Sequence, residues 1–217
     1  MSEVPGNAEP QLRINNEWRS RGYLPHRERI GLLQSITFRL ADSLPQEKLR
    51  ELEMVKNAEL GLRVPGVDVE KRKRIEVWLN AGMGSCALGH PQMAAVMQDT
   101  LLKFDEQKYH LVAWCIMPNH VHVLVEPKVK LSKIVQSWKS FTGRWAMKHN
   151  AELGLSASRF WMHDYWDRYI RDEQHLLFVI DYIHNNPVKA GLCLKETDWL
   201  WSSAYMFNAS IKNQHME

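Results

Sequence analysis

Two histidines separated by one residue, His120 and His122, are the first residues in this sequence whose types and spacing suggest chemistry. Successive side chains of a β-strand alternate between its faces, so on a strand these two imidazoles share one face, about 6.5–7 Å apart along the chain. Both can then bind one divalent ion, while Val121 and Val123 enter the core on the other face. Imidazole nitrogen suits zinc, manganese and similar ions. The alternative is a pair of exposed strand histidines without a metal, and the pair alone does not decide.

A second candidate is the run DYIHNNPVK at residues 181–189. Tyr182 and Asn186 are four residues apart, so on a helix they are neighbours on one face. A tyrosine there can attack a phosphorus atom as a nucleophile, and an asparagine one turn away can complete a three-ligand metal site. His184 points away from Tyr182 on such a helix and is a poor candidate for its base. The alternative is an ordinary amphipathic helix whose end Pro187 explains.

Residues 128–148 contain several basic residues and no acidic one. Cations interleaved with aromatic rings are typical of a groove for single-stranded nucleic acid. An amphipathic helix with an apolar inner face and a basic outer face has the same pattern, and both interpretations remain open at this point. The cations are Lys128, Lys130, Lys133, Lys139, Arg144 and Lys148, and the rings are Trp138, Phe141 and Trp145.

The composition bounds the class of protein. The 217 residues, 45% hydrophobic and 24% charged, suit one globular domain with attached arms. The longest apolar run, residues 111–117, is too short to span a bilayer, and the first ten residues lack the apolar core of a signal peptide. Three cysteines without a CxxC pair argue against a disulfide framework and favour a reducing cytoplasm. The net charge of +3 is only a mild tilt toward nucleic acid.

The elements that must position these residues follow from periodicity and turn signals. We expect strands at 34–40, 109–117 and 120–126, the last two forming a tight hairpin, and an extended segment at 159–170. We expect helices at 46–60, 68–80, 91–104, 131–149 and from 172 to about 191, with a loop at 81–90. Residues 1–30 read as a basic arm. The order predicts an α+β sandwich, an antiparallel sheet with helices packed on one face.

Seven segments, in this order along the chain, resemble the REP-associated tyrosine transposases. These are bacterial HUH endonucleases related to the single-strand transposases of small insertion sequences. The resemblance covers about residues 20–206, and several blocks in order are far more specific than the histidine pair. The segments are RGYLPH (21–26), SITFRLADSLP (35–45), AWCIMPNHVHVL (113–124), SWKSFT (137–142), YWDRYIRD (165–172), YIHNNPVKAGL (182–192) and WSS (201–203).

This resemblance implies a ferredoxin-like or RRM-like HUH domain at 31–206, with a charged helical insertion at about 46–80. Residues 1–30 would be a basic arm and residues 207–217 a C-terminal tail. By position in the motifs, Tyr182 matches the family's nucleophile and His120 and His122 its metal-binding histidines. Asn186 takes the place where relatives use a Gln or Asn as third ligand. The implied cofactor is Mg²⁺ or Mn²⁺.

The implied activity is cleavage and rejoining of single-stranded DNA beside REP-type hairpins, through a 5′-phosphotyrosine intermediate. The enzyme would act in the cytoplasm as a monomer or homodimer, without a membrane. The residues expected to contact DNA are Arg19, Arg21, His26, Arg27, Lys133, Trp138, Lys139, Arg144 and Lys189. Three other functions remain possible: a hairpin-binding regulatory protein without cleavage activity, a metal-dependent hydrolase of small phosphate esters, and an RNA-binding sheet.

Overall fold

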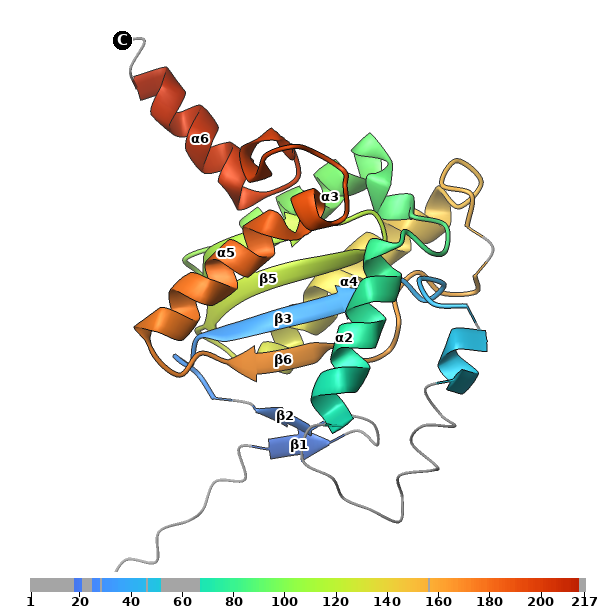
Figure 1. Cartoon of the computed structure of the whole chain (residues 1–217), viewed down its shortest axis with the longest axis horizontal. Coiled ribbons are helices and arrows are strands. Elements are labelled where there is room, and N and C mark those ends of the chain that lie inside the picture. The colour runs from blue at the N-terminus through green and yellow to red at the C-terminus, as the bar shows by residue number, and fades with distance from the viewer. Residues whose placement is uncertain are drawn as a thin grey trace, which may run out of the picture.

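A computed structural model describes residues 18–20, 25–27, 29–45, 47–51, 67–155 and 157–214. Its centre is a four-stranded antiparallel sheet with the strand order β4-β5-β3-β6 (Figure 1). The strands of this sheet are β3 (Gln34–Arg39), β4 (Tyr109–Ile116), β5 (His120–Pro127) and β6 (Trp166–Tyr169). The α-helices are α2 (Val67–Asn80), α3 (Pro91–Leu102), α4 (Leu131–Lys148), α5 (Glu173–Lys189) and α6 (Ser203–Gln214). Two 3₁₀ turns are η1 (Ala87–Gly89) and η2 (Glu196–Asp198).

The connections identify the topology. The chain runs β3-α3-β4-β5-α4-β6, and the strand that starts this unit lies inside the sheet between β5 and β6. This is the split βαβ arrangement of ferredoxin-like folds. The expected α+β class and its antiparallel sheet are therefore confirmed, and α5 is an addition after the last strand of the unit.

The hairpin of β4 and β5 is as tight as the sequence predicts. Met117, Pro118 and Asn119 lie between the two strands, and the Met117 amide donates to the His120 carbonyl oxygen at 2.9 Å, which closes a turn around Pro118 and Asn119. The other edge of β5 pairs with β3, which places Thr37 opposite His122 and Arg39 opposite His120. A two-residue connection fixes the register of the hairpin, so it also fixes which face each histidine occupies.

Helices cover both faces of the sheet, whereas the sequence led us to expect one. On one face α3 and α4 pack against alternate residues of the strands, including Phe38 and Val123. On the other face α5 packs through Val179 and Ile183 against a smaller cluster that includes Leu124 (Figure 1). The reason is that β4 and β5 are buried along nearly their whole length, so each face needs a cover.

The ends of α5 follow from its sequence. The Asp172 carboxylate accepts a hydrogen bond from the His175 amide at 2.8 Å, which caps the first turn. Past the other end, Gly191 has a φ of +70°, the left-handed conformation that glycine adopts most readily after a helix. Pro187 lies inside the last turn and does not end the helix, which continues to Lys189.

The predicted insertion is helical where the structure describes it. Residues 47–51 are helical and α2 covers the whole of the second predicted helix, 68–80, whereas the predicted turn between the two helices lies outside the described residues. Ile75 and Leu79 of α2 form a small cluster with Leu44, against which Trp166 of β6 packs. In Figure 1, α2 lies on the same side of the sheet as α5.

Both ends of the chain contain more structure than the sequence suggests. Within the predicted basic arm, β1 (Trp18–Ser20) pairs antiparallel with β2 (Pro25–Arg27). Near the C-terminus, α6 continues through the expected boundary between residues 206 and 207, so the structure shows no break there. The segment before α6 borders β4: the Ile116 amide donates to the Trp201 carbonyl oxygen at 2.9 Å, which satisfies a backbone group at the edge of the sheet.

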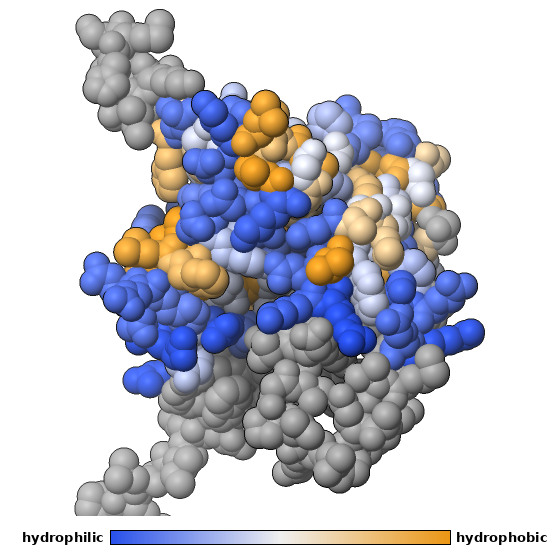
Figure 2. Space-filling view, in the orientation of Figure 1, coloured by the Kyte–Doolittle hydropathy of each residue, from blue (hydrophilic) through white to orange (hydrophobic). Residues whose placement is uncertain are grey.

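Polar residues dominate the described surface on the side of α5 and α2. In Figure 2 hydrophilic residues cover most of this view, and hydrophobic residues form separate patches. Among the described helices, none is long and apolar enough to cross a bilayer.

Candidate functional site

The two histidines of β5 lie side by side and point their ring nitrogens at each other. The Nε2 atoms of His120 and His122 are 3.0 Å apart, and the rings are nearly perpendicular. Both side chains are buried, with exposures of 1% and 2%, so the alternative of two exposed strand histidines is wrong. The alternation of the strand places them on the α5 face, while Val121 and Val123 enter the core under α3 and α4.

The side chains of Asn119 and Thr37 contact the two imidazoles and orient them. The Nδ1 atom of His120 lies 2.8 Å from Oδ1 of Asn119, whose amide nitrogen donates to the carbonyl oxygens of Leu79 and Met83. Because Oδ1 can only accept, His120 carries its proton on Nδ1, and its Nε2 lone pair is free for another partner. His122 has an equivalent partner, the Thr37 hydroxyl, 2.9 Å from its Nδ1.

Both imidazoles are neutral at physiological pH. Burial lowers the pKa of His120 well below its ordinary value, and the neighbouring His122 lowers it further. Burial lowers the pKa of His122 to about 3, with an added effect of the Lys189 charge. Neutral imidazole is the form that binds metal ions, so the local electrostatics keep this pair ready for a cation.

Helix α5 brings the tyrosine to this pair. The rings of Tyr182 and His122 meet edge to face with centroids 5.5 Å apart. One turn later, the side-chain amide of Asn186 donates to the Tyr182 carbonyl oxygen at 2.7 Å. After two turns, the Lys189 ammonium lies 5.0 Å from the centre of the Tyr182 ring. The predicted i, i+4 and i+7 face is therefore present and lies at the histidines.

The hydroxyl of Tyr182 has a partner that the sequence did not suggest. It donates a hydrogen bond to Oε1 of Glu76, which belongs to α2. Burial raises the pKa of Tyr182 above its ordinary value, and the Glu76 carboxylate raises it further, whereas Asn186 acts in the opposite direction. The phenol is thus protonated at rest. His184 points elsewhere, as expected, with Nε2 2.7 Å from the Ser203 hydroxyl.

The donor set fits a divalent cation. Two nitrogens bound to one ion at about 2.1 Å lie about 3 Å apart when they occupy adjacent positions, and the observed Nε2 separation is 3.0 Å. The Oδ1 atom of Asn186 is buried and has no hydrogen-bond partner among the described residues. An orphaned buried carbonyl oxygen is costly unless it binds something. His120 and His122 thus offer imidazole nitrogens, which suit transition-metal ions, and Asn186 offers a carbonyl oxygen, which suits Mn²⁺ and Mg²⁺.

Arg39 is a buried cation on the same face of the sheet. It lies opposite His120 in the register and is 5% exposed. One of its terminal nitrogens donates to the Ser43 hydroxyl at 3.0 Å, while Nε has no hydrogen-bond partner among the described residues. Burial lowers its pKa to about 10. A buried guanidinium with a spare donor suits an anionic group.

The basic helix α4 lies on the other face of the sheet, away from the histidines. Lys133 and Arg144 are exposed there, as is Phe141 at 48%. Lys139 is half-buried, and its ammonium donates to the carbonyl oxygens of His163 and Asp164. These residues therefore form a surface separate from the candidate active site.

Trp138 corrects one of our expectations. Its ring is 1% exposed, packs against Phe38 and Tyr109, and donates through Nε1 to the Tyr109 hydroxyl at 3.0 Å. A ring in this position cannot stack on a base, so Trp138 is a core residue. Of the expected contacts in the N-terminal arm, Arg21 lies outside the described residues. Arg19, His26 and Arg27 are described only through the backbone of β1 and β2.

A cavity of about 620 Å³ lies between α4 and the segment 158–165. Its lining includes Lys139, Arg144, Arg159 and His163. Arg144 and Arg159 are exposed, so the opening is basic. This is the part of α4 that best suits a nucleic-acid backbone, on the face opposite the histidines.

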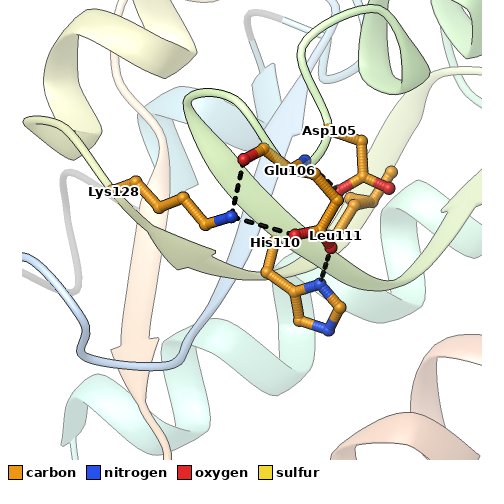
Figure 3. A network of polar contacts seen from close by, with 5 residues as sticks. All are labelled: Asp105, Glu106, His110, Leu111 and Lys128. Carbon is orange, nitrogen blue, oxygen red and sulfur yellow. Dashed lines mark hydrogen bonds and ion pairs between the residues drawn. The ribbon is translucent and has the colours of Figure 1, made fainter.

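A cluster of Asp105, Glu106 and His110 presents three candidate metal ligands near the start of β4 (Figure 3). Its groups are already engaged: Glu106 contacts His110 and forms an ion pair with Lys128 at 2.9 Å, and Asp105 accepts from the Leu111 amide at 2.8 Å. The hairpin register places His110 opposite Glu126, at the end of β5 remote from His120. We therefore interpret this cluster as a loop anchor and not as part of the candidate site.

Sequence reasoning missed four residues of the site. Thr37 and Arg39 had a usable signal, because the period of β3 places both on the face opposite Phe38. Asn119 directly precedes the histidine pair, and its role as a tether depends on the end of α2. No sequence pattern indicated that Glu76 belongs to the site, since it is 106 residues from Tyr182 and lies in a helix with many charged residues.

Comparisons with known proteins show which families the sequence is similar to. Residues 92–186 match the family model described as Transposase IS200 like. This region begins in α3 and ends at Asn186, so it contains both histidines and Tyr182 but not α2.

Two curated relatives are similar over about half of the chain. The "Putative REP-associated tyrosine transposase" of Haemophilus influenzae is 30% identical over 117 residues, which are 50% of this chain and 64% of that protein. The REP-associated tyrosine transposase of Escherichia coli is 24% identical over 99 residues, 45% of this chain and 56% of that protein. The chain thus spans less than two thirds of each relative. A solved REP-associated tyrosine transposase bound to a REP hairpin aligns at 18% identity with a TM-score of 0.49, over 85% of this chain and 83% of that one.

Proposed function

We propose that this chain, whose residues 92–186 match the Transposase IS200 like family model and which is similar to two REP-associated tyrosine transposases, cleaves and rejoins single-stranded DNA beside hairpins of the REP type. The observation that carries the proposal is the contact of the Tyr182 ring with His122, whose Nε2 lies 3.0 Å from that of His120. A phenol beside a neutral imidazole pair supplies a nucleophile and a cation site within one small region.

In the proposed reaction Tyr182 attacks the phosphorus atom of a DNA phosphodiester. Its oxygen forms the new bond while the 3′-oxygen leaves, which gives a 5′-phosphotyrosine and a free 3′-hydroxyl. One phosphodiester replaces another of similar energy, so a second 3′-hydroxyl can reverse the step and join strands without ATP. Helix α5 orients the phenol because Val179 and Ile183 anchor its inner face in the core.

His120, His122 and Asn186 would hold a divalent ion, Mg²⁺ or Mn²⁺. When bound, such an ion offsets negative charge on the non-bridging phosphate oxygens. The chain adds its own cations: Lys189 lies over the Tyr182 ring, where its ammonium can hold a flanking phosphate, and Arg39 has a spare donor on the same face. Thr37 and Asn119 keep the two imidazoles in position.

The exposed cations of α4 would hold the DNA outside the reacting phosphate. Lys133 and Arg144 are exposed, and the cavity beside Arg144 is lined by further basic residues. Because this surface and the histidines lie on different faces, a hairpin that contacts both must extend around an edge of the sheet. We assign Lys139 a supporting role, since its ammonium is engaged by two backbone carbonyl oxygens.

The test is formation of a covalent protein–DNA adduct. A labelled REP-type hairpin oligonucleotide with a single-stranded flank is incubated with the protein and Mn²⁺ and separated on a denaturing gel. We expect an adduct with the wild-type protein, none with Tyr182→Phe, and unchanged hairpin binding in a native gel. Tyr205→Phe, a change of an exposed tyrosine in α6, is the matched control and should keep the adduct.

An adduct in Tyr182→Phe would end the assignment of this nucleophile. Hairpin binding by the wild-type protein without any adduct would instead favour a hairpin-binding regulatory protein. Cleavage of a generic phosphodiester that persists in Tyr182→Phe would favour a hydrolase that uses water.

A further inference from the structure

We propose that Glu76 is a catalytic residue, the general base that accepts the proton of Tyr182 when its oxygen attacks phosphorus. This inference rests on the proposed function and adds a group to it. Sequence reasoning found no base, and Glu76 lies outside the region that matches the transposase family model. It belongs to the inserted helix α2, so the assignment concerns a feature of this chain beyond the matched domain.

Contact geometry is the first support. The Tyr182 hydroxyl donates its hydrogen bond to Oε1 of Glu76, so the carboxylate already contacts the proton that must leave. A general base must be within hydrogen-bond reach of that proton. His184 fails this criterion because its Nε2 atom contacts Ser203, and the ring nitrogens of His120 and His122 are engaged by each other and by their neighbours.

The second support is that α2 is anchored to the site. Asn119 donates to the carbonyl oxygens of Leu79 and Met83, at the end of the helix that carries Glu76. The same side chain accepts from His120. Glu76 and the histidine pair are therefore connected through one buried amide, which keeps the carboxylate in a fixed place relative to the phenol.

Glu76 has the position of a proton acceptor and not of a metal ligand. Among the described residues, the only group in which three His, Cys, Asp or Glu ligand atoms lie within 4.8 Å of one another is the remote Asp105 cluster. The Glu76 carboxylate therefore does not converge with both imidazoles. The phenol, in turn, needs an acceptor, because its oxygen must lose a proton when it forms a bond to phosphorus.

The proposed step balances as follows. The O–H bond of Tyr182 breaks and its proton moves to Oε1 of Glu76, while the phenolic oxygen forms a bond to phosphorus. The bond between phosphorus and the 3′-oxygen breaks, the 3′-oxygen takes a proton from water, and Glu76 releases its proton to solvent. In the rejoining step Glu76 first regains a proton from solvent and then returns it to the departing phenolic oxygen, as reversibility requires.

The experiment compares Glu76→Gln with Asp181→Asn. Glutamine keeps the size and can still contact the phenol, but it cannot accept the proton. Asp181 is exposed, directly precedes Tyr182 and bonds Asn185, so its change removes an equal charge nearby. In a single-turnover assay of adduct formation with the hairpin oligonucleotide and Mn²⁺, we expect Glu76→Gln to be slower by about 100-fold or more, and Asp181→Asn to remain close to wild type. Hairpin binding and Mn²⁺ affinity should be unchanged in both.

A rescue experiment separates chemistry from structure. Glu76→Ala leaves space beside the phenol, so added sodium formate should raise its rate of adduct formation in proportion to the formate concentration. Formate should not help Glu76→Gln, where the amide fills the space, or Tyr182→Phe, which lacks the nucleophile. A merely structural role of Glu76 would not respond to a small carboxylate.

Several outcomes would overturn the inference while the proposed function stands. A rate in Glu76→Gln within a few-fold of wild type, or faster, would mean that the carboxylate only restrains the phenol. Loss of Mn²⁺ binding in Glu76→Gln would make Glu76 a ligand. Failure of formate to act on a folded Glu76→Ala would exclude proton transfer to a carboxylate at this place. If the wild-type protein forms no adduct, the proposed function itself fails.

Discussion

The two faces of the central sheet differ in what their side chains do. Under α3 and α4 the strands present an apolar layer, represented by Phe38, Val121 and Val123, and Trp138 completes it from α4. Under α5 and α2 the intervening residues of the same strands include the histidine pair. One alternating pattern therefore builds a stabilising face and a reactive face from the same strands.

This difference explains how the chain tolerates so many buried polar groups. A buried imidazole, hydroxyl or guanidinium lowers stability unless it has partners, and the α5 face provides many of them through Thr37, Asn119 and Ser43. Two of the buried polar atoms without a hydrogen-bond partner among the described residues, Asn186 Oδ1 and Arg39 Nε, lie on that face, whereas Trp114 Nε1 belongs to a residue of the apolar cluster. The apolar face carries the packing that holds the reactive face in place.

The sharpest test of this division is Trp138→Ala. Removal of a fully buried ring should lower the free energy of unfolding by about 3–5 kcal/mol, and it also removes the hydrogen bond to Tyr109. Chemical denaturation measures the change, and Mn²⁺ affinity of the folded protein should be nearly unchanged. Trp145→Ala, at a half-buried ring stacked on His149, should cost less. A loss below about 1 kcal/mol for Trp138→Ala would contradict its place in the core.

On the α5 face of the sheet we expect a smaller effect, a loss of Mn²⁺ affinity, for Thr37→Val. Valine has nearly the shape of threonine but no hydroxyl, so His122 loses the partner of its Nδ1 atom. The affinity for Mn²⁺, measured by calorimetry, should fall by about 10–100-fold. Thr37→Ser keeps the hydroxyl and should retain most of the affinity. If valine and serine behave alike, the hydroxyl does not orient the imidazole.

We expect the smallest effects, on hairpin binding, for substitutions of the exposed cations of α4. Lys133→Gln and Arg144→Gln should each weaken hairpin binding and reduce the dependence of log Kd on log salt concentration by about one. Fluorescence anisotropy over a salt series measures both. Lys195→Gln removes an equal charge from the turn before η2 and serves as the control. Identical salt slopes in all three variants would mean that α4 presents only a solvated basic face.

Much of the scaffold could be predicted from local patterns. The alternation of β5 predicted that both histidines share a face, and helical spacing predicted that Tyr182, Asn186 and Lys189 do as well. The same helical period placed Trp138 on the inner face of α4 together with Leu131, Ile134 and Val135. The apolar spacing around Trp138 is stronger evidence for burial than the neighbouring cations are for DNA contact. It should have excluded Trp138 from the expected DNA contacts.

What could not be predicted depends on contacts between distant segments. The placement of α5 on the second face follows from burial of both sides of β4 and β5, which one sequence does not reveal for short apolar runs. The contact between Glu76 and Tyr182 joins α2 to α5, two helices that are far apart in the sequence. No periodicity encodes it, because any of the acidic residues of α2 satisfies the same local rules.

Asn119 links the end of α2 to the histidine pair. Its amide group satisfies two carbonyl oxygens at the end of α2 and one imidazole of β5 with a single side chain. Removal of α2 would take away Leu79, one of the two acceptors of a buried carboxamide that also orients the imidazole of His120. The end of α2 is thus bonded to the turn between β4 and β5, so the position of this helix and that of the histidine pair depend on each other.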